Sequence, residues 1–294
     1  MQRLEFGTLV AMLRTELGWT QAQLAEHAEI ENATLSNIER GAKKYFEPDL
    51  LFRLANALQL TSIERREFFL ASCGLDHSQL LRQPSLTNPT NAFETEKIIE
   101  NLINLMSQMY APAHLGDVFG DVIAVNNLLL ETMQVNVAAL GTFSQNKKSR
   151  INNLTIAFNP EITSVFHESS NESLIAILRA FRESSIRYRA KRRYAELMDE
   201  LHNMKKYPLF ARYWRRVSTF EDDREFMLDP FEITHTVHGT LRFTLTSSVI
   251  ITSHGELYLS HFTPLDINTT NAIIKIAETA GKNAIQLSQY PWED

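Results

Sequence analysis

Residues that start or end helices divide the first 75 residues into five short segments. These boundary signals constrain the fold more than any other feature of the sequence. Thr20 is a natural N-cap for the second segment, and Gly41 is the glycine expected just after the third. Pro48 or Asp49 opens the fourth, while Thr61 and Glu64 have the spacing of a capping box for the fifth. Apolar residues recur at helical spacing between these signals. A small all-α domain of five helices over residues 1–75 is therefore predicted.

Composition changes after this helical region. Residues 76–93 are rich in Pro, Ser, Thr and Asn, which predicts a linker. A helix over residues 94–109 has apolar residues at heptad-like spacing for barely two repeats, so we favour packing on its own domain over a coiled coil. Strand-forming segments then flank a helical middle, and dense Thr, Val, Ile and Phe mark a meander near the end. Residues 94–294 are thus predicted to form an α+β domain with one antiparallel sheet.

Cysteine usage and hydropathy exclude several classes of protein. Cys73 is the single cysteine, which excludes a disulfide framework and a cysteine-based zinc site and indicates a reducing compartment. No apolar run reaches the length of a membrane span, and Glu5 stands where a signal peptide would carry basic residues. We therefore expect a cytoplasmic protein with no membrane partner.

Charge is unevenly distributed along the chain, whose net charge is −6. Residues 187–216 hold ten Lys and Arg against three acids, whereas residues 1–80 hold eight against eleven. The basic run is interleaved with aromatic residues, as nucleic-acid surfaces often are. A solvated helix face, turned toward the acidic region of a neighbouring molecule, is the interpretation we favour, and a second phosphate-contacting surface is the alternative.

The second and third segments carry a recognisable motif. The sequence TQAQLAEHA at residues 20–28, followed by ENATLSNIERG at residues 31–41, resembles the Cro/C1-type (XRE-family) helix-turn-helix. The resemblance implies that the second helix of the pair enters the major groove of double-stranded DNA. Its base-contacting side chains would be Asn32, Ala33, Thr34, Ser36 and Asn37.

The same resemblance implies roles for residues around the motif. Arg14 and Glu39 would form an internal salt bridge, and a homodimer would read paired half-sites. Glu29 stands where the family usually has a glycine, which implies a different turn or some strain. The side chains implied to contact backbone phosphates are Gln21, Arg40, Lys43 and Lys44.

The C-terminal region is similar to the MmyB-like ligand-binding domain, a PAS-related module, through loose motifs that occur in order. These are Ala111-Pro112-Ala113, Asp121 to Asn126, Phe158-Asn159-Pro160, Pro208-Leu209-Phe210 and His238-Gly239-Thr240-Leu241. The resemblance implies a cavity that senses a small apolar ligand such as a long-chain fatty acid. Its expected lining is Val125, Phe158, Leu178, Phe181, Phe210, Trp214 and Phe243, with Arg179, Arg182 or Asn126 as donors to a carboxylate. The alternative is that these aromatic residues only fill a core.

Catalytic and metal-binding patterns are weak. The stretch from His167 to Asn171 lacks the second histidine of a zinc-peptidase motif. His235 and His238 are predicted on opposite faces of a strand, where they would share no ion. We expect no enzyme and no cofactor other than a fatty acid held as ligand.

Together these observations predict a bacterial transcription regulator in which ligand binding biases the spacing of two DNA-binding domains through residues 76–109. The alternative hypothesis makes the C-terminal domain a dimerisation or partner-docking module that binds no ligand.

Overall fold

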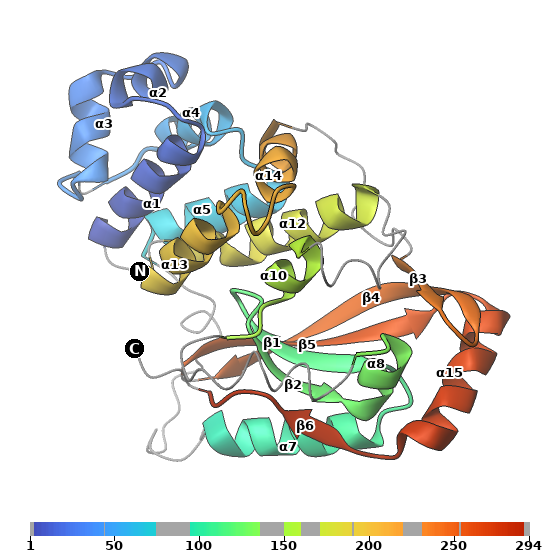
Figure 1. Cartoon of the computed structure of the whole chain (residues 1–294). Coiled ribbons are helices and arrows are strands. Elements are labelled where there is room, and N and C mark those ends of the chain that lie inside the picture. The colour runs from blue at the N-terminus through green and yellow to red at the C-terminus, as the bar shows by residue number, and fades with distance from the viewer. Residues whose placement is uncertain are drawn as a thin grey trace, which may run out of the picture. The chain divides into compact units, whose positions relative to one another are not determined.

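The computed structural model describes residues 3–43, 45–74, 95–135, 150–159, 171–189, 191–219, 231–252 and 254–290 (Figure 1). The expected linker, residues 76–93, lies outside these ranges. The described residues form two compact units. The helical unit draws on Met1–Ser85, Arg179–Glu200 and Trp214–Asp223, and the sheet unit draws on Leu86–Leu178, Leu201–Tyr213 and Arg224–Asp294. Within the described ranges, no helix has the length and apolar character that crossing a membrane requires.

The helical unit contains the five predicted helices. They are α1 (Arg3–Glu16), α2 (Gln21–His27), α3 (Asn32–Glu39), α4 (Pro48–Ala57) and α5 (Ser62–Ser72). Thr20 and Thr61 each accept a hydrogen bond from the helix they cap, and each closes a capping box with a residue three positions later. The apolar faces of the helices meet in one core that includes Phe6, Leu24, Leu35, Leu54 and Phe68.

Helices α1 and α3 approach each other closely at Gly7. A Cβ atom at this position would lie 2.4 Å from the carbonyl oxygen of Ile38, near the end of α3. Real side chains do not tolerate such a distance, so glycine is what allows the two backbones to touch. This contact makes α1 a direct support for α3.

Later parts of the chain complete the helical unit. They are the second half of α12 (Asn171–Ser185), the 3₁₀ helix η1 (Ile186–Tyr188), most of α13 (Arg192–Leu201) and the end of α14 (Phe210–Thr219). Ile186 is buried in the same core as the first five helices. The boundary between the units falls inside α12, after Leu178. The sequence had grouped all of these residues with the C-terminal domain, because a long-range apolar contact leaves no local pattern.

The sheet unit contains one six-stranded antiparallel sheet in the order β3-β4-β5-β1-β2-β6. The predicted strands are present as β1 (Ala113–Asp117), β2 (Val122–Asn126), β3 (Phe231–His235), β4 (Gly239–Thr252) and β5 (Gly255–Pro264). The sequence did not predict the short edge strand β6 (Ala284–Gln286) or the short helix α10 (Asn153–Phe158). Neither is long enough to establish a period.

Helices cover both faces of this sheet (Figure 1). Helix α7 (Thr95–Gln108) packs its buried Ile99 and Met106 against β1, β2 and β5, as expected for a helix on its own domain. Helices α8 (Asn127–Thr132) and α15 (Ile267–Ala280) share a second core with Phe243 of β4. The α+β architecture predicted from the sequence is thereby confirmed.

Candidate functional site

Helix α3 presents a polar face away from the core of the helical unit. Leu35 and Ile38 are buried beneath it and fix its rotation about its own axis. The expected base-contacting residues lie on the other side: Asn32, Ala33 and Asn37 are exposed, while Thr34 and Ser36 are half-buried. A short helix held by its apolar side, with amide and hydroxyl groups outward, has the form of a major-groove reader.

An ion pair connects α1 to the end of α3. Arg14 Nε donates to Glu39 Oε1 at 2.7 Å, and Arg14 Nη2 donates to Glu39 Oε2 at 3.1 Å. The salt bridge implied by the resemblance is therefore confirmed. Gln21 Nε2 also donates to Glu39 Oε2, at 2.7 Å, and Arg14 Nη1 donates to the carbonyl of Trp19 at 2.6 Å. The side chain of Gln21, the candidate for a phosphate contact, is thus held by the same Glu39 carboxylate that connects α3 to α1.

The turn between α2 and α3 keeps a glycine-like conformation without glycine. Glu29 has a φ of 53°, in the left-handed region. Arg53 Nη1 donates to the carbonyl oxygen of Glu29 at 2.7 Å, which stabilises the turn from α4. Glu29 therefore adopts the left-handed backbone that a glycine would supply, with the strain that a non-glycine residue has there.

The basic residues after α3 differ in their surroundings. Arg40 is exposed, and its Nη2 donates to Asn37 Oδ1 at 2.8 Å while its Nε donates to the carbonyl of Ser36 at 3.3 Å. Arg40 therefore orients one of the expected base-contacting amides. Lys43 is half-buried, and Lys44 lies outside the described residues.

The seven expected ligand-lining residues are all buried, five of them in the sheet unit and two in the helical unit. In the sheet unit, Val125 and Phe243 share a core, and Phe158 meets Phe210 edge to face at 5.4 Å between ring centroids. In the helical unit, Phe181 lies 6.2 Å from Trp214. Leu178 and Arg179 are the adjacent residues of α12 between which the unit boundary falls, with Leu178 buried and Arg179 half-buried.

The side-chain amide of Asn126, one of the expected donors to a ligand carboxylate, makes four hydrogen bonds within the protein. Its Nδ2 donates to the carbonyl of Ala111 at 2.9 Å and to that of Met106 at 3.3 Å. Its Oδ1 accepts from the backbone amides of Ala113 and Leu129, each at 2.9 Å. These four bonds tie α7, β1 and α8 to β2 and cap α8.

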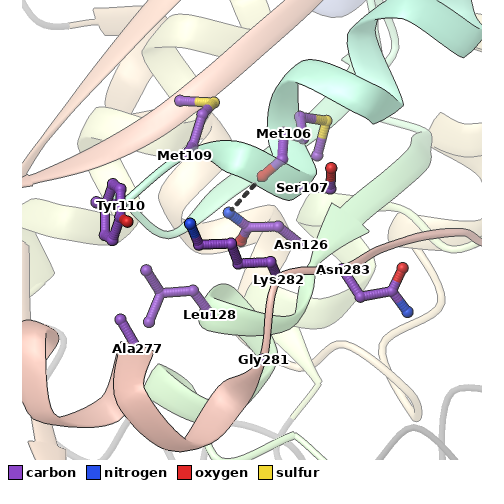
Figure 2. A pocket seen from close by; sticks show the side chains of 10 residues that line it. All are labelled: Met106, Ser107, Met109, Tyr110, Asn126, Leu128, Ala277, Gly281, Lys282 and Asn283. Atoms are coloured by element: carbon purple, nitrogen blue, oxygen red, sulfur yellow. Dashed lines mark hydrogen bonds between the residues drawn. The ribbon is translucent and has the colours of Figure 1, made fainter.

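A small open pocket borders Asn126 (Figure 2). It lies where the ends of α7 and α15 approach the start of α8, and Lys282 Nζ stands 5.1 Å from the Tyr110 ring centroid at this site. Its volume is about 30 Å³, which is room for one or two water molecules. The remaining lining residues are Met106, Ser107, Met109, Leu128, Ala277, Gly281 and Asn283.

His114 is a buried polar residue that the sequence analysis did not single out. It lies on β1, and its Nε2 is 3.2 Å from Nδ2 of Asn153 on α10. Burial lowers the pKa of His114 to about 4, so the ring is neutral at physiological pH. All five residues of β1 are buried, so an alternating pattern could not have identified this side chain, and only the fold shows that it is enclosed.

The basic run of residues 187–216 contributes a buried arginine. Arg189 Nη1 donates to Glu16 Oε2 at 2.9 Å, and its Nη2 donates to Glu64 Oε1 at 3.2 Å. The sequence predicted a solvated face turned toward the acids of a neighbouring molecule. At Arg189 that prediction is wrong on both points, since this side chain is fully buried and its acidic partners belong to the same chain.

The structure also corrects the prediction for the histidine pair. The rings of His235 and His238 lie 4.8 Å apart, because β3 ends at His235 and the chain then turns. His235 Nδ1 accepts from the backbone amides of Val237 and His238, at 3.1 and 3.2 Å. Among the residues that the structure describes, no three His, Cys, Asp or Glu side chains gather as metal ligands would. The incomplete zinc-peptidase motif from His167 to Asn171 lies outside those ranges except for Asn171.

Comparisons with known proteins match both regions of the chain. A family model described as a helix-turn-helix domain matches residues 5–68, and one described as the MmyB-like transcription regulator ligand binding domain matches residues 100–273. Among solved structures, the restriction-modification controller protein C.AhdI from Aeromonas hydrophila is 29% identical, with a TM-score of 0.21. That match covers 22% of this chain and 94% of the other. No curated protein matches the chain.

Proposed function

The chain belongs to the MmyB-like transcription regulators, and from this premise we propose that it is a homodimeric, ligand-responsive repressor or activator that reads operator DNA with α3. The observation that carries the proposal is the outward polar face of α3, from Asn32 to Asn37, over the buried Leu35 and Ile38. One helix of eight residues contacts too few base pairs for useful specificity, which supports two copies on paired half-sites.

Replacement of Asn32 and Asn37 by Ala tests the DNA assignment. An operator is first selected from a random duplex pool with the wild-type chain, and affinities are measured at fixed salt concentration. We expect each amide to contribute about 1–3 kcal/mol and the double variant to lose base preference at the matching positions. The control is Thr15→Ala, an exposed position on α1. Unchanged affinity and base preference in the double variant would refute the assignment.

For the sheet unit we propose a PAS-like sensor of a small apolar molecule, with a long-chain fatty acid as the first candidate. The buried aromatic residues Phe158, Phe210 and Phe243 support an apolar site. Of the three expected carboxylate donors, Asn126 and Arg182 already donate to acceptors within the chain. Arg179 and Arg182 belong to the helical unit, so within the sheet unit we add the neutral His114 as a candidate for an uncharged head group.

A docking module without a ligand is the second candidate function of the sheet unit. The pocket beside Asn126 has about 30 Å³, whereas ligand pockets usually enclose roughly 300–1,000 Å³, so this pocket by itself has no room for a fatty acid. Native and denaturing mass spectrometry of the freshly purified chain separates the two functions. A dimer that loses a fatty-acid mass on denaturation supports the sensor. A ligand-free dimer whose melting temperature is unchanged by palmitic acid supports the docking module.

A further inference from the structure

Glu64 lies at the centre of a buried ionic site in the helical unit. Its Oε2 accepts from the backbone amide of Thr61 at 2.9 Å and so closes the capping box of α5. Its Oε1 accepts from Arg182 Nε at 2.5 Å and from Arg189 Nη2 at 3.2 Å. All three charged side chains are at least 96% buried. A carboxylate this far from water requires both arginines to remain charged and bonded.

Glu16, the last residue of α1, is the second acid of this site. Its Oε2 accepts from Arg189 Nη1 at 2.9 Å, and its Oε1 accepts from the hydroxyl of Tyr194 at 2.9 Å. Burial alone would lower the pKa of Arg189, but Glu16, Tyr194 and Glu64 raise it above its ordinary value. Arg189 is therefore a permanent cation between two carboxylates from α1 and α5.

Apolar contacts accompany these charges. The rings of Phe181 and Tyr194 stack, with centroids 6.0 Å apart and planes inclined by 6°. Ile186 enters the core of the five N-terminal helices, and η1 packs against α5. We name the residues that fill the acidic site, Arg179–Arg189 and the first turn of α13, the arginine segment.

The last turn of α1 joins the arginine segment to the recognition helix. Arg14 holds Glu39 at the end of α3, and Glu16, two residues later, holds Arg189. The close approach of α1 to α3 at Gly7 leaves little freedom between these helices. A shift of the arginine segment that moves Glu16 therefore moves a helix to which α3 is directly attached.

The other end of the connection is α12 itself. Its first half belongs to the sheet unit and its second half carries Phe181 and Arg182 into the helical unit. The match to the ligand-binding family spans residues 100–273 and so includes the whole arginine segment. A part of the ligand-binding domain, as defined by sequence, thus completes the fold of the DNA-binding unit.

We propose that Glu16 and Glu64 form an input surface on the DNA-binding unit, that the arginine segment is its occupant, and that the last turn of α1 relays the position of this segment to α3. The proposal rests on the proposed function for its DNA-linked part. It differs from the expected route through residues 76–109, because the connection here runs through α12. The Nε of Arg189 is buried and has no hydrogen-bond partner among the described residues, so one donor of the site is left unsatisfied.

Hydrogen exchange of the full chain, measured by mass spectrometry, tests the proposal without DNA first. In Glu64→Gln we expect exchange of α1, α5, η1 and α13 to quicken at least tenfold, while β1 and β5 change less than twofold. The control is Glu196→Gln, the same chemical change at a half-exposed acid of α13 that pairs with Arg192 on the surface. Faster exchange confined to α5, with η1 and α13 unchanged, would overturn the proposal that they form one site.

Selected operator DNA is then added to the wild type and to both variants. In the wild type and in Glu196→Gln we expect DNA to slow exchange in α3 and also in η1 and α13, since stabilising a cooperative unit protects all its members. In Glu64→Gln, DNA should protect α3 but no longer η1 and α13. Protection of α3 without protection of η1 and α13 in the wild type would refute the relay alone. Absence of protection in α3 would instead refute the proposed function. The measurement without DNA would still show whether Glu16, Glu64 and the arginine segment form one site.

Discussion

The last turn of α1 carries two ion pairs that differ in how deeply they are buried and in how far apart their partners lie in the sequence. On one side Arg14 pairs with Glu39, 25 residues away, and both side chains keep some exposure. On the other side Glu16 pairs with Arg189, 173 residues away, and Arg189 is completely buried. The first site belongs to the helix-turn-helix motif itself, whereas the second brings in a segment of the ligand-binding region. The comparison indicates that one turn of helix serves both the internal geometry of the DNA reader and its connection to the rest of the chain.

The largest effect is expected at the deeper site. In Arg189→Met, Glu16 and the fully buried Glu64 each lose a charged partner, and breaking a buried ion pair typically costs about 3–5 kcal/mol. We expect the free energy of unfolding of the helical unit to fall by about that amount in urea titrations. The control Arg192→Met removes an exposed partner of Glu196 and should change little. Equal losses in the two variants would remove the distinction between a buried and a surface arginine.

A smaller loss is expected at the shallower site. Arg14→Met leaves Glu39 with Gln21 as a donor and keeps some access to water, so about 1–3 kcal/mol of stability should be lost. Because Glu39 positions Gln21 and the end of α3, operator affinity should fall as well. Chemical denaturation and DNA titration on the same preparation measure both quantities. A stability loss larger than that of Arg189→Met would reverse the proposed order of the two sites.

Glu29→Gly should increase stability. The residue holds a φ of 53°, and a non-glycine side chain in this region costs about 1 kcal/mol or slightly more. We expect a gain of about 1 kcal/mol, seen as a higher melting temperature with unchanged operator preference. Gln59→Gly is a matched control with a φ of 54° but without the arginine contact that stabilises Glu29. A destabilised Glu29→Gly with a stabilised Gln59→Gly would show that the turn depends on the Glu29 side chain.

A further effect concerns pH. Burial, together with the charge of Glu64, raises the pKa of Glu183 from its ordinary value of 4.5 to about 7, against the opposing contributions of Thr61, Arg179 and Arg182. The folded chain therefore keeps a proton between pH 4.5 and about 7 that the unfolded chain has lost, and stability contributed by this group falls as pH rises through that window.

Glu183→Gln removes this titration. Melting temperatures of the variant should decline less between pH 5 and about 8 than those of the wild type, and the variant should be the more stable of the two at the upper end. The same difference between pH values in both proteins would mean that Glu183 is ionised in the fold throughout.

The helical unit was predictable where its signals are local. Thr20, Thr61 and Gly41 mark helix ends within a few residues, and the apolar positions of α3 define its outward face. The sequence identified Glu64 as half of a capping box but could not show its other role. The arginines bound to its second oxygen come 118 and 125 residues later in the chain. From a single sequence there is no way to infer that charged residues so far apart in the chain form an ion pair.

The sheet unit shows the same division. Its long strands follow from β-branched residues and glycine turns, whereas β6 and α10 are too short to predict. The expected ligand residues were chosen because they are apolar or basic within family-like motifs. The fold buries the apolar ones, but burial alone does not distinguish a cavity wall from a core.

The affinity of the full chain for its selected operator, measured with and without saturating palmitic acid, tests the central claim most directly. A ligand-responsive regulator should show a change of at least about fivefold, in either direction, and Glu64→Gln should show a smaller change because its arginine segment is released. Identical wild-type affinities, with palmitic acid shown by mass spectrometry to be bound, would contradict the account.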